Sequence, residues 1–399
     1  MSTSVENELS DRYAGGEVEI RPVTVREIHD FARRAVADRE RIGVVPVSLA
    51  RARAWQSNPY AKAEDVALLV AWQEEQCVGY FGLLPGRLRI GDRVETVHWS
   101  STFYVAEEFR HTCASIRLLQ EAVGLQRHLF VTGFSPKVGE FYEAFGFKPL
   151  GPLSYWALEL PQCNPLGVRF RSLRSRRRKN GRTDSPWLDR LVLGSDWVFK
   201  KLAYALLRRR SARVLRRWET RRAGRIPDRP AIQSPDVNGR ARFVRDADAI
   251  NWMLTDHWYT TRVEERTEGY YFDDWCRVHE YRAVEIHRKT GGSPCGWAVL
   301  RLHATRRHRS LMVCDYDLSD PDVYGCLAAL AVREGGRMLA DSIVLPDACA
   351  DAASAWPLLR RLIRRKHRAY YWYPQGNGAE RAAISRDVQL SLADGDMAF

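Results

Sequence analysis

The residues best suited to chemistry follow a segment rich in aromatic and β-branched residues that ends near Val105. A short polar loop comes next, and it consists of Arg110, His111, Thr112, Cys113, Ala114 and Ser115. An apolar pattern of helical spacing follows the loop. A strand that leads through a tight loop into a helix leaves unpaired backbone N–H groups at the positive end of the helix dipole. Small side chains let an anion approach these groups, so the pattern indicates a diphosphate site.

A second segment, FSPKVGEFYEAFGF, lies one helix and one strand further along. Together the two segments resemble the GNAT acetyltransferase superfamily. The superfamily's phosphate loop has Arg or Gln, two residues, Gly, one residue, and then Gly or Ala. Arg110 fits the first position, whereas Cys113 and Ser115 replace the two small residues. The later motif of Tyr, three residues, Gly and Phe is matched from Tyr142 to Phe147.

The resemblance implies an acyl-CoA-dependent N- or O-acyltransferase in which an amine or hydroxyl attacks the thioester directly. Acetyl-CoA or another acyl-CoA would be the co-substrate, without a metal, and the acceptor would be an amino sugar or another small metabolite. The implied acid for the leaving thiolate is Tyr142. The implied coenzyme-binding residues are Tyr104, Val105, Arg110, His111, Thr112, Cys113, Ala114 and Ser115.

The base that takes the acceptor's proton has two candidates, Glu95 and His98. Both lie on the predicted strand that leads to the loop. Because they are three positions apart, their side chains face opposite sides of the strand, and at most one can point into the site. The ordinary pKa of histidine is close to neutral, which favours His98 slightly.

These residues need a scaffold, and the hydrophobic pattern predicts one of mixed α and β elements. Expected in order are a strand near 17–24, two helices, three antiparallel strands at 66–72, 77–90 and 94–105, a helix, a strand at 129–132, a helix and a last strand near 155–160. A similar order recurs after residue 240, with strands at 282–287, 296–303 and 311–318, a helix at 323–335, a strand at 343–345, a helix at 355–367 and a strand at 388–392.

The fold class expected from this repetition is α/β (a mixed α+β sheet) with two tandem GNAT-like domains. The expected ranges are an N-terminal tail at 1–16, an acyl-CoA-binding domain at 17–162, a basic linker with an amphipathic helix at 163–239, and a second, degenerate domain at 240–399. In the second domain the segment DYDLSDPDVYG stands where a phosphate loop would be. Its acidic residues would repel a diphosphate, so this copy is not expected to bind coenzyme.

The net charge of +13 comes from one segment. Residues 168–225 hold 20 Lys and Arg against four acids, so the rest of the chain carries a charge of −3. Residues 172–186 are expected to form a charged loop, and Trp and Leu residues after it recur at helical spacing. Three partners remain open for this segment: one of the domains, an anionic membrane surface, or nucleic acid. The aromatic residues lie on the apolar stripe and not among the arginines, which disfavours nucleic acid.

Two other functions stay open: an aminoacyl transferase that uses charged tRNA, and a binding protein whose coenzyme site has decayed. The eight cysteines form no Cys-x-x-Cys pair, which argues against a zinc site or a disulfide framework. No apolar run reaches the length of a membrane span. The expected location is therefore the cytoplasm, with peripheral contact at the inner face of the membrane as a further expectation for residues 168–225. The pattern does not predict an oligomeric state.

Overall fold

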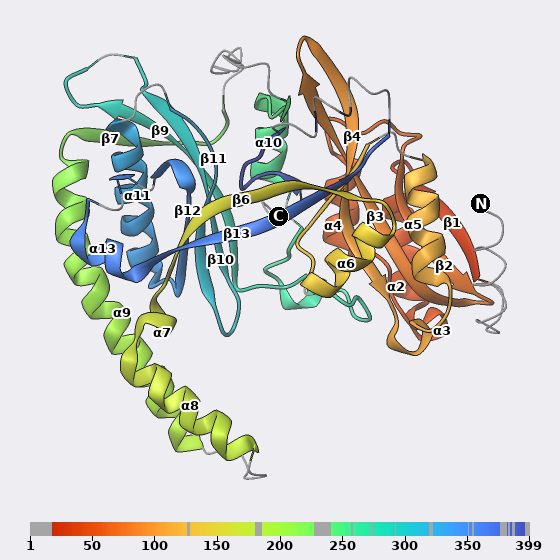
Figure 1. Ribbon diagram of the computed structural model, residues 1–399, viewed down its shortest axis with the longest axis horizontal. Coiled ribbons are helices and arrows are strands. Elements are labelled where there is room, and N and C mark those ends of the chain that lie inside the picture. Colours follow the sequence, from red (N-terminus) through yellow and green to blue (C-terminus); the bar gives the residue numbers. More distant parts are fainter. Residues whose placement is uncertain are drawn as a thin grey trace. The chain divides into compact units, whose positions relative to one another are not determined.

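Two runs of six strands, each with the same strand order, organise the chain (Figure 1). The computed structural model describes residues 18–395 except 126–127, 180–185, 227–240, 257, 273, 292, 319–321, 350, 353–354, 376–380, 382–383 and 385–387. Unit 1 combines residues 1–153, 226–276 and 368–399, and unit 2 combines residues 154–225 and 277–367. Both units are therefore discontinuous in sequence, unlike the continuous domains 17–162 and 240–399 expected above. The expected N-terminal tail, 1–16, lies outside the described residues.

Unit 1 follows the predicted order of elements closely. It contains strands β1 (Val18–Thr24), β2 (Val66–Gln73), β3 (Gln76–Ile90), β4 (Arg93–Val105), β5 (Leu129–Thr132), β8 (Ala241–Phe243) and β14 (Val388–Gln389). Its helices are α2 (Ile28–Ala37), α3 (Arg39–Ile42), α4 (Leu49–Gln56), η1 (Glu107–Phe109), α5 (Ala114–Leu125), α6 (Pro136–Ala144), α10 (Ala247–Thr255) and η2 (Val263–Glu265). Strand β6 (Lys148–Glu159) begins in unit 1 and ends in unit 2.

The sheet of unit 1 runs β1-β2-β3-β4-β5 and is completed by a strand from the far end of the chain. The first four strands are antiparallel, and β5 pairs with β4 in parallel. Residues Tyr370–Tyr373 of strand β13 (Ile363–Tyr373) then pair with β5 in antiparallel fashion. Helix α5 packs its apolar face on this sheet, with Leu118 and Leu119 fully buried. Burial of this face fixes where the helix begins relative to β4.

Unit 2 repeats this topology. It contains helices α7 (Leu160–Cys163), α8 (Pro165–Lys179), α9 (Pro186–Leu215), α11 (Asp322–Met338), η3 (Asp347–Cys349) and α13 (Pro357–Leu362). Its strands are β7 (Trp218–Ala223), β9 (Val278–Arg288), β10 (Gly296–Ala304), β11 (Arg309–Leu318) and β12 (Ser342–Pro346). The order β7-β9-β10-β11 is antiparallel, and β12 adds in parallel. Residues Tyr155–Glu159 of β6 supply the sixth, antiparallel strand.

Each sheet thus takes its sixth strand from a distant part of the chain. The strand after α6, which would complete unit 1 if the units were continuous, completes unit 2 instead. The strand before the C-terminal segment completes unit 1. The expected fold class, a mixed α/β sheet fold present twice in tandem with a basic helical segment between the copies, is confirmed.

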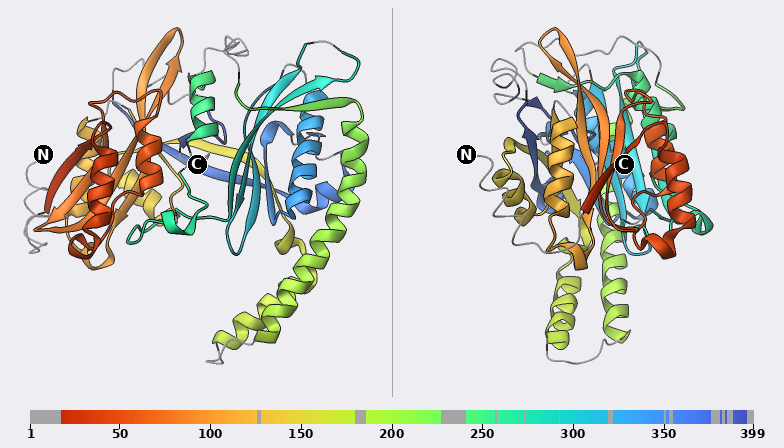
Figure 2. Two further views of the ribbon diagram at one scale, coloured as in Figure 1. Left: turned by 180° about the vertical axis from the view of Figure 1, so that it is seen from behind. Right: turned by 90° about the vertical axis from the view of Figure 1, so that its right-hand side faces the viewer.

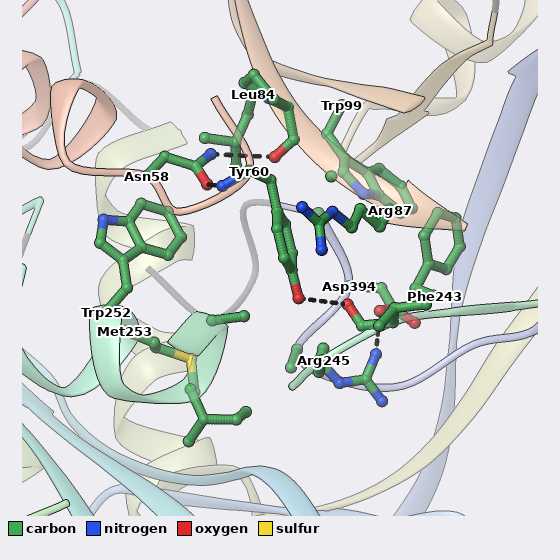
Figure 3. Close-up of a pocket in the computed structure, with 17 residues that line it drawn as sticks. Asn58, Tyr60, Leu84, Arg87, Trp99, Phe243, Arg245, Trp252, Met253 and Asp394 are labelled. Carbon is green, nitrogen blue, oxygen red and sulfur yellow. Dashed lines mark hydrogen bonds and ion pairs between the residues drawn. The ribbon is translucent and has the colours of Figure 1, made fainter. Parts of the chain in front are cut away.

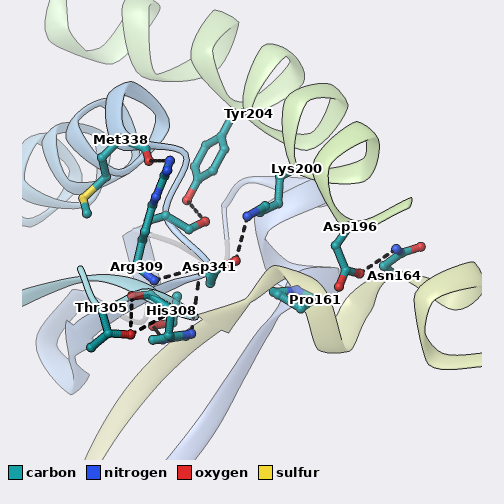
Figure 4. A network of polar contacts seen from close by, with 12 residues as sticks. Pro161, Asn164, Asp196, Lys200, Tyr204, Thr305, His308, Arg309, Met338 and Asp341 are labelled. Atoms are coloured by element: carbon teal, nitrogen blue, oxygen red, sulfur yellow. Dashed lines mark hydrogen bonds and ion pairs between the residues drawn. The ribbon is translucent and has the colours of Figure 1, made fainter. Parts of the chain in front are cut away.

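Helix α9 is anchored to unit 2 by its C-terminal half, and its N-terminal half pairs with α8 (Figures 1 and 2). Figure 4 shows the polar anchors: Lys200 Nζ lies 2.7 Å from Asp341 Oδ1, and Tyr204 Oη donates to the carbonyl of Ala340 at 3.1 Å. Near α8, Asn164 donates to Asp196 at 2.8 Å. Ala203 and Leu207 add buried apolar contacts with the core of unit 2.

Two expectations about secondary structure are wrong. The expected loop at 172–186 is helical as far as Lys179 in α8, because Arg, Lys and Leu favour helices and ion pairs join α8 to α9. Arg171 and Arg174 contact Asp196 and Asp189 at 2.6 and 3.0 Å. The expected helix at 355–367 ends at Leu362 in α13, and the chain continues as β13. The sequence Ala-Tyr-Tyr-Trp-Tyr favours strand, and pairing with β5 satisfies its backbone.

Candidate active site

The predicted loop lies at the end of β4, where β4 and β5 separate. The two strands pair only at His98 with Leu129 and at Trp99 with Phe130. Ser101 is an extra residue on β4, since Gly82 faces Thr102 and Leu83 faces Ser100 across the ladder. Such a bulge bends a strand and changes where its side chains point. Beyond the bulge, the two strands border a cavity.

This cavity has a volume of about 550 Å³ and lies entirely within unit 1. Residues from Ser100 to Val105 of β4 line one side, and Thr132 to Phe134 line another. Helix α5 contributes Ser115 from its first turn, and α6 contributes Tyr142. A cavity of this size can hold a substantial part of a cofactor-sized ligand.

Positive charge dominates the lining. Arg110 and Lys137 are the charged residues that line the cavity, and its described lining includes no carboxylate. The remaining polar groups are hydroxyls from Ser, Thr and Tyr residues. An arginine, a lysine and the start of a helix together favour an anionic group over a cationic or purely apolar one.

The loop before α5 is partly capped by its own atoms. Thr112 Oγ1 donates to the carbonyl of Phe109 at 2.7 Å and accepts from the Ala114 amide at 3.3 Å. The amides of Ser115 and Ile116, in the first turn of α5, have no acceptor within the helix. Because Ser115 lines the cavity, the cavity extends to the first turn of α5.

The loop does not need glycine for its backbone conformation. Among the described residues other than glycine, only Glu74 and Leu339 have a positive φ. Cys113 and Ser115 therefore stand in ordinary conformations where the superfamily motif has Gly or Ala. Their side chains fill space that glycine would leave open, but they do not strain the chain.

The predicted coenzyme residues divide into two groups. Tyr104, Val105, Arg110 and Ser115 line the cavity, whereas His111, Thr112, Cys113 and Ala114 are not among its lining residues. Thr112 and Ala114 are buried within the loop and the helix start. They shape the loop, and their roles in coenzyme binding stay predictions.

Tyr142 lies in an aromatic cluster beside the cavity. Its side chain is buried, and its ring centroid is 5.3 Å from that of Phe134 and 5.0 Å from that of Phe147. Aromatic packing of this kind fixes the ring, so that the hydroxyl has a defined position. Tyr142 is therefore held rigidly next to the cavity, as a proton donor would need to be.

Neither candidate base lines the cavity. His98 is buried on β4, and burial lowers the pKa of its imidazole to about 4. Within the described part of the chain, neither ring nitrogen of His98 has a hydrogen-bond partner. Ser100 lies two positions further along, on the same face of the strand, and does line the cavity. Glu95 is half-buried nearer the start of β4.

The cavity also contains residues that the sequence motifs do not indicate. Tyr271 and Phe272 come from the segment that follows η2, and the Tyr271 ring stacks on Tyr104 with centroids 4.1 Å apart. Their only signal in the sequence is the run Tyr270-Tyr271-Phe272. Lys137, in the first turn of α6, was not predicted as a site residue because a lone lysine at a helix start is usually a surface residue.

A second cavity of unit 1 is much smaller, about 70 Å³ (Figure 3). Its polar groups largely satisfy one another: Tyr60 Oη donates to Asp246 Oδ1 at 3.0 Å, and Arg245 forms an ion pair with Asp394. Arg87 lies over the ring of Tyr60, with 4.6 Å between the guanidinium carbon and the ring centroid. This volume accommodates a few water molecules and not a coenzyme, so the larger cavity is the candidate active site.

The corresponding part of unit 2 is unsuited to an anion. Asp315 and Asp317 lie near the end of β11, just before α11. Burial and the neighbouring carboxylate of Asp315 raise the pKa of Asp317 to about 6. A diphosphate beside these two carboxyl groups would experience repulsion. That the second copy does not bind coenzyme stays a prediction. Residues 319–321 of this segment lie outside the described residues.

No protein-family model and no curated protein matches the chain. Solved structures similar to it include a GCN5-related N-acetyltransferase from Anabaena variabilis, at 11% identity and a TM-score of 0.45 over 89% of this chain and 72% of that one. A probable N-acyltransferase from Enterococcus faecalis V583 has 9% identity and a TM-score of 0.48 over the same shares. A tandem GNAT protein from the clavulanic acid biosynthesis pathway has 13% identity and a TM-score of 0.44 over 91% of this chain and 100% of that one. These likenesses are too distant to assign an activity or a site, and the strand order of each unit is the stronger support for the fold.

Proposed function

We propose that unit 1 is an acyl-CoA-dependent N- or O-acyltransferase, with acetyl-CoA or another acyl-CoA as co-substrate. The observation that carries this proposal is the cavity of about 550 Å³ at the divergence of β4 and β5. Its two charged residues are cations, and it reaches the first turn of α5 at Ser115. This combination suits a ligand with a diphosphate at one end and an uncharged thioester at the other.

The proposed reaction is a direct transfer. The nitrogen or oxygen of the acceptor attacks the thioester carbonyl carbon, the C–S bond breaks, and the thiolate leaves. Tyr142 then donates its phenolic proton to the thiolate sulfur. Backbone N–H groups along β4 that are freed by its divergence from β5 would polarise the carbonyl as negative charge develops on oxygen. An amino sugar or another small metabolite is the proposed class of acceptor.

The acceptor must also lose a proton, and His98 is the preferred base. Its low pKa keeps the imidazole neutral at pH 7, so a lone pair is available, although a base of low pKa accepts a proton weakly. A water molecule between Ser100 and His98 would connect the cavity to the ring. Glu95 stays the alternative base.

Binding of acetyl-CoA to the full chain tests the proposal. At a ligand concentration about 100 times the dissociation constant, binding stabilises the folded state by about 2.7 kcal/mol, which raises the melting temperature by about 5 °C or more. Arg110→Glu and Lys137→Glu should each remove most of this shift. Arg93→Glu makes the same charge change at the exposed start of β4, outside the cavity, and should keep it.

The same titration separates the other functions. Binding of charged tRNA with a steep salt dependence, without an effect of acetyl-CoA, would favour the aminoacyl transferase. If neither ligand changes the melting temperature, the chain is a binding protein without this chemistry. If acetyl-CoA raises the melting temperature of the Arg110→Glu variant as much as that of the unaltered chain, the loop is not part of the coenzyme site.

A further inference from the structure

Helices α8 and α9, which lie side by side (Figure 2), expose many apolar side chains. Fifteen large hydrophobic residues of the described chain are exposed, and ten of them lie on these two helices. Leu193 and Leu202 expose 69% and 61% of their surface. Scattered exposed leucines are normal on a protein surface, but a concentration of this kind marks a binding surface.

Four of the exposed apolar residues of α9 form a stripe. Trp187, Leu191, Val198 and Leu202 are four, seven and four positions apart, which places them on one face of the helix. The opposite face, with Leu188, Val192, Ala203 and Leu207, is buried. The stripe is therefore the outward face of α9, separate from the face that packs on unit 2.

Basic side chains border this stripe. Arg190, Lys201 and Arg208 are 11 and seven positions apart, so they form a row along one edge of it. All three are exposed, and none has an acidic partner among the described residues. Lys201 extends over the ring of Trp197, with Nζ 4.0 Å from the ring centroid. A cation held at the edge of an apolar stripe is typical of helices that lie in a membrane interface.

The two acidic residues of α9 do not offset this charge. Asp189 and Asp196 are engaged by Arg174 and Arg171 of α8. The outward face of α9 consequently presents apolar and positive groups without a carboxylate. A second copy of the chain would bring like charges together in either orientation. Nucleic acid would match the charge but leave the leucines and tryptophans in contact with water.

We propose that the outward face of α9, supported by α8, docks on an anionic lipid bilayer. The stripe would enter the boundary between headgroups and acyl chains, and the basic row would contact anionic headgroups. None of the helices in the described residues is long and apolar enough to cross a bilayer.

The test is co-sedimentation of the full chain with vesicles. We expect strong binding to phosphatidylcholine vesicles that contain about 30% phosphatidylglycerol and weak binding to phosphatidylcholine alone. The triple variant Arg190→Gln, Lys201→Gln, Arg208→Gln should lower the partition coefficient about a hundredfold. A matched variant, Lys148→Gln, Lys289→Gln, Arg307→Gln, removes three exposed charges elsewhere and should bind like the unaltered chain.

A second variant separates docking from simple charge attraction. Leu191→Gln, Val198→Gln, Leu202→Gln should lower the partition coefficient at least tenfold, and its residual binding should disappear in high salt. These positions are exposed, so folding should not be affected. Equal binding to both kinds of vesicle would contradict the proposal. So would a dimer in solution that this variant dissociates, or salt-sensitive binding to nucleic acid with none to vesicles.

Discussion

At the scale of single residues, one substitution at Tyr142 can distinguish a role in packing from a role as proton donor. Its ring packs against Phe134 and Phe147, and the residue lines the cavity. Tyr142→Phe keeps the packing and removes only the proton donor. We expect kcat for acyl transfer to fall at least about a hundredfold, while the KM for acetyl-CoA and the melting temperature change little. Release of the CoA thiol in the presence of amine acceptors measures this, and an unchanged kcat would leave Tyr142 a packing residue only.

His98 gives a prediction about stability and pH. Its folded pKa of about 4 is below the usual 6.5, so the unfolded chain binds a proton more readily than the folded one. Above pH 6.5, His98 is neutral in both states and does not lower the free energy of unfolding. As the pH falls from 6.5 toward 4, protonation of His98 in the unfolded chain lowers the free energy of unfolding by on the order of 3 kcal/mol. His98→Leu should reduce this acid-dependent loss. Urea unfolding at pH 7 and pH 4.5 measures it, and identical losses in both proteins would contradict the assigned pKa.

At the scale of elements, β13 contributes to the stability of unit 1 through a pairing with β5 that the local sequence does not indicate. Trp372 is fully buried, and its ring stacks on Phe130 of β5 with centroids 6.3 Å apart. Trp372→Ala should destabilise unit 1 by about 3–5 kcal/mol in urea unfolding. Trp187→Ala, on the exposed stripe of α9, is the matched control and should cost less than about 1 kcal/mol. Similar costs for both would mean that β13 does not hold unit 1 together.

The elements also show what a sequence can predict. The strands β2 to β5 and the helix α5 were predicted within a few residues, because each has a clear apolar period and a turn at its end. Residues 363–367, the first part of β13, were assigned to a helix because their arginines and lysine favour helices locally. Its pairing with β5, more than 200 residues away in sequence, decides its conformation. Lys137 and Tyr271 were missed at the site for the same reason, since only the fold brings them to the cavity.

At the scale of the whole molecule, the exchange of sixth strands means that neither half of the sequence contains a complete unit. Residues 17–162 contain β1 to β5 but lack the strand Tyr370–Tyr373 and the segment 241–276. Without them, β5 would become an edge strand that pairs with β4 alone, and Phe130 would lose its contacts with Phe243 and Trp372. Unit 2 in turn needs residues Tyr155–Glu159 of β6.

We therefore expect that the fragment 17–162, expressed alone, shows no cooperative unfolding transition and aggregates. Fragments 1–225 and 226–399 together contain every strand of both sheets, because the break lies between the segments of unit 1 and unit 2 and not within a strand. Co-expressed, they should form a complex that unfolds cooperatively and whose melting temperature rises with acetyl-CoA. Circular dichroism and co-purification measure both outcomes. A soluble, cooperatively folding fragment 17–162 with the same response to acetyl-CoA would show that the first part of the chain is an independent domain and that the exchanged strand is dispensable.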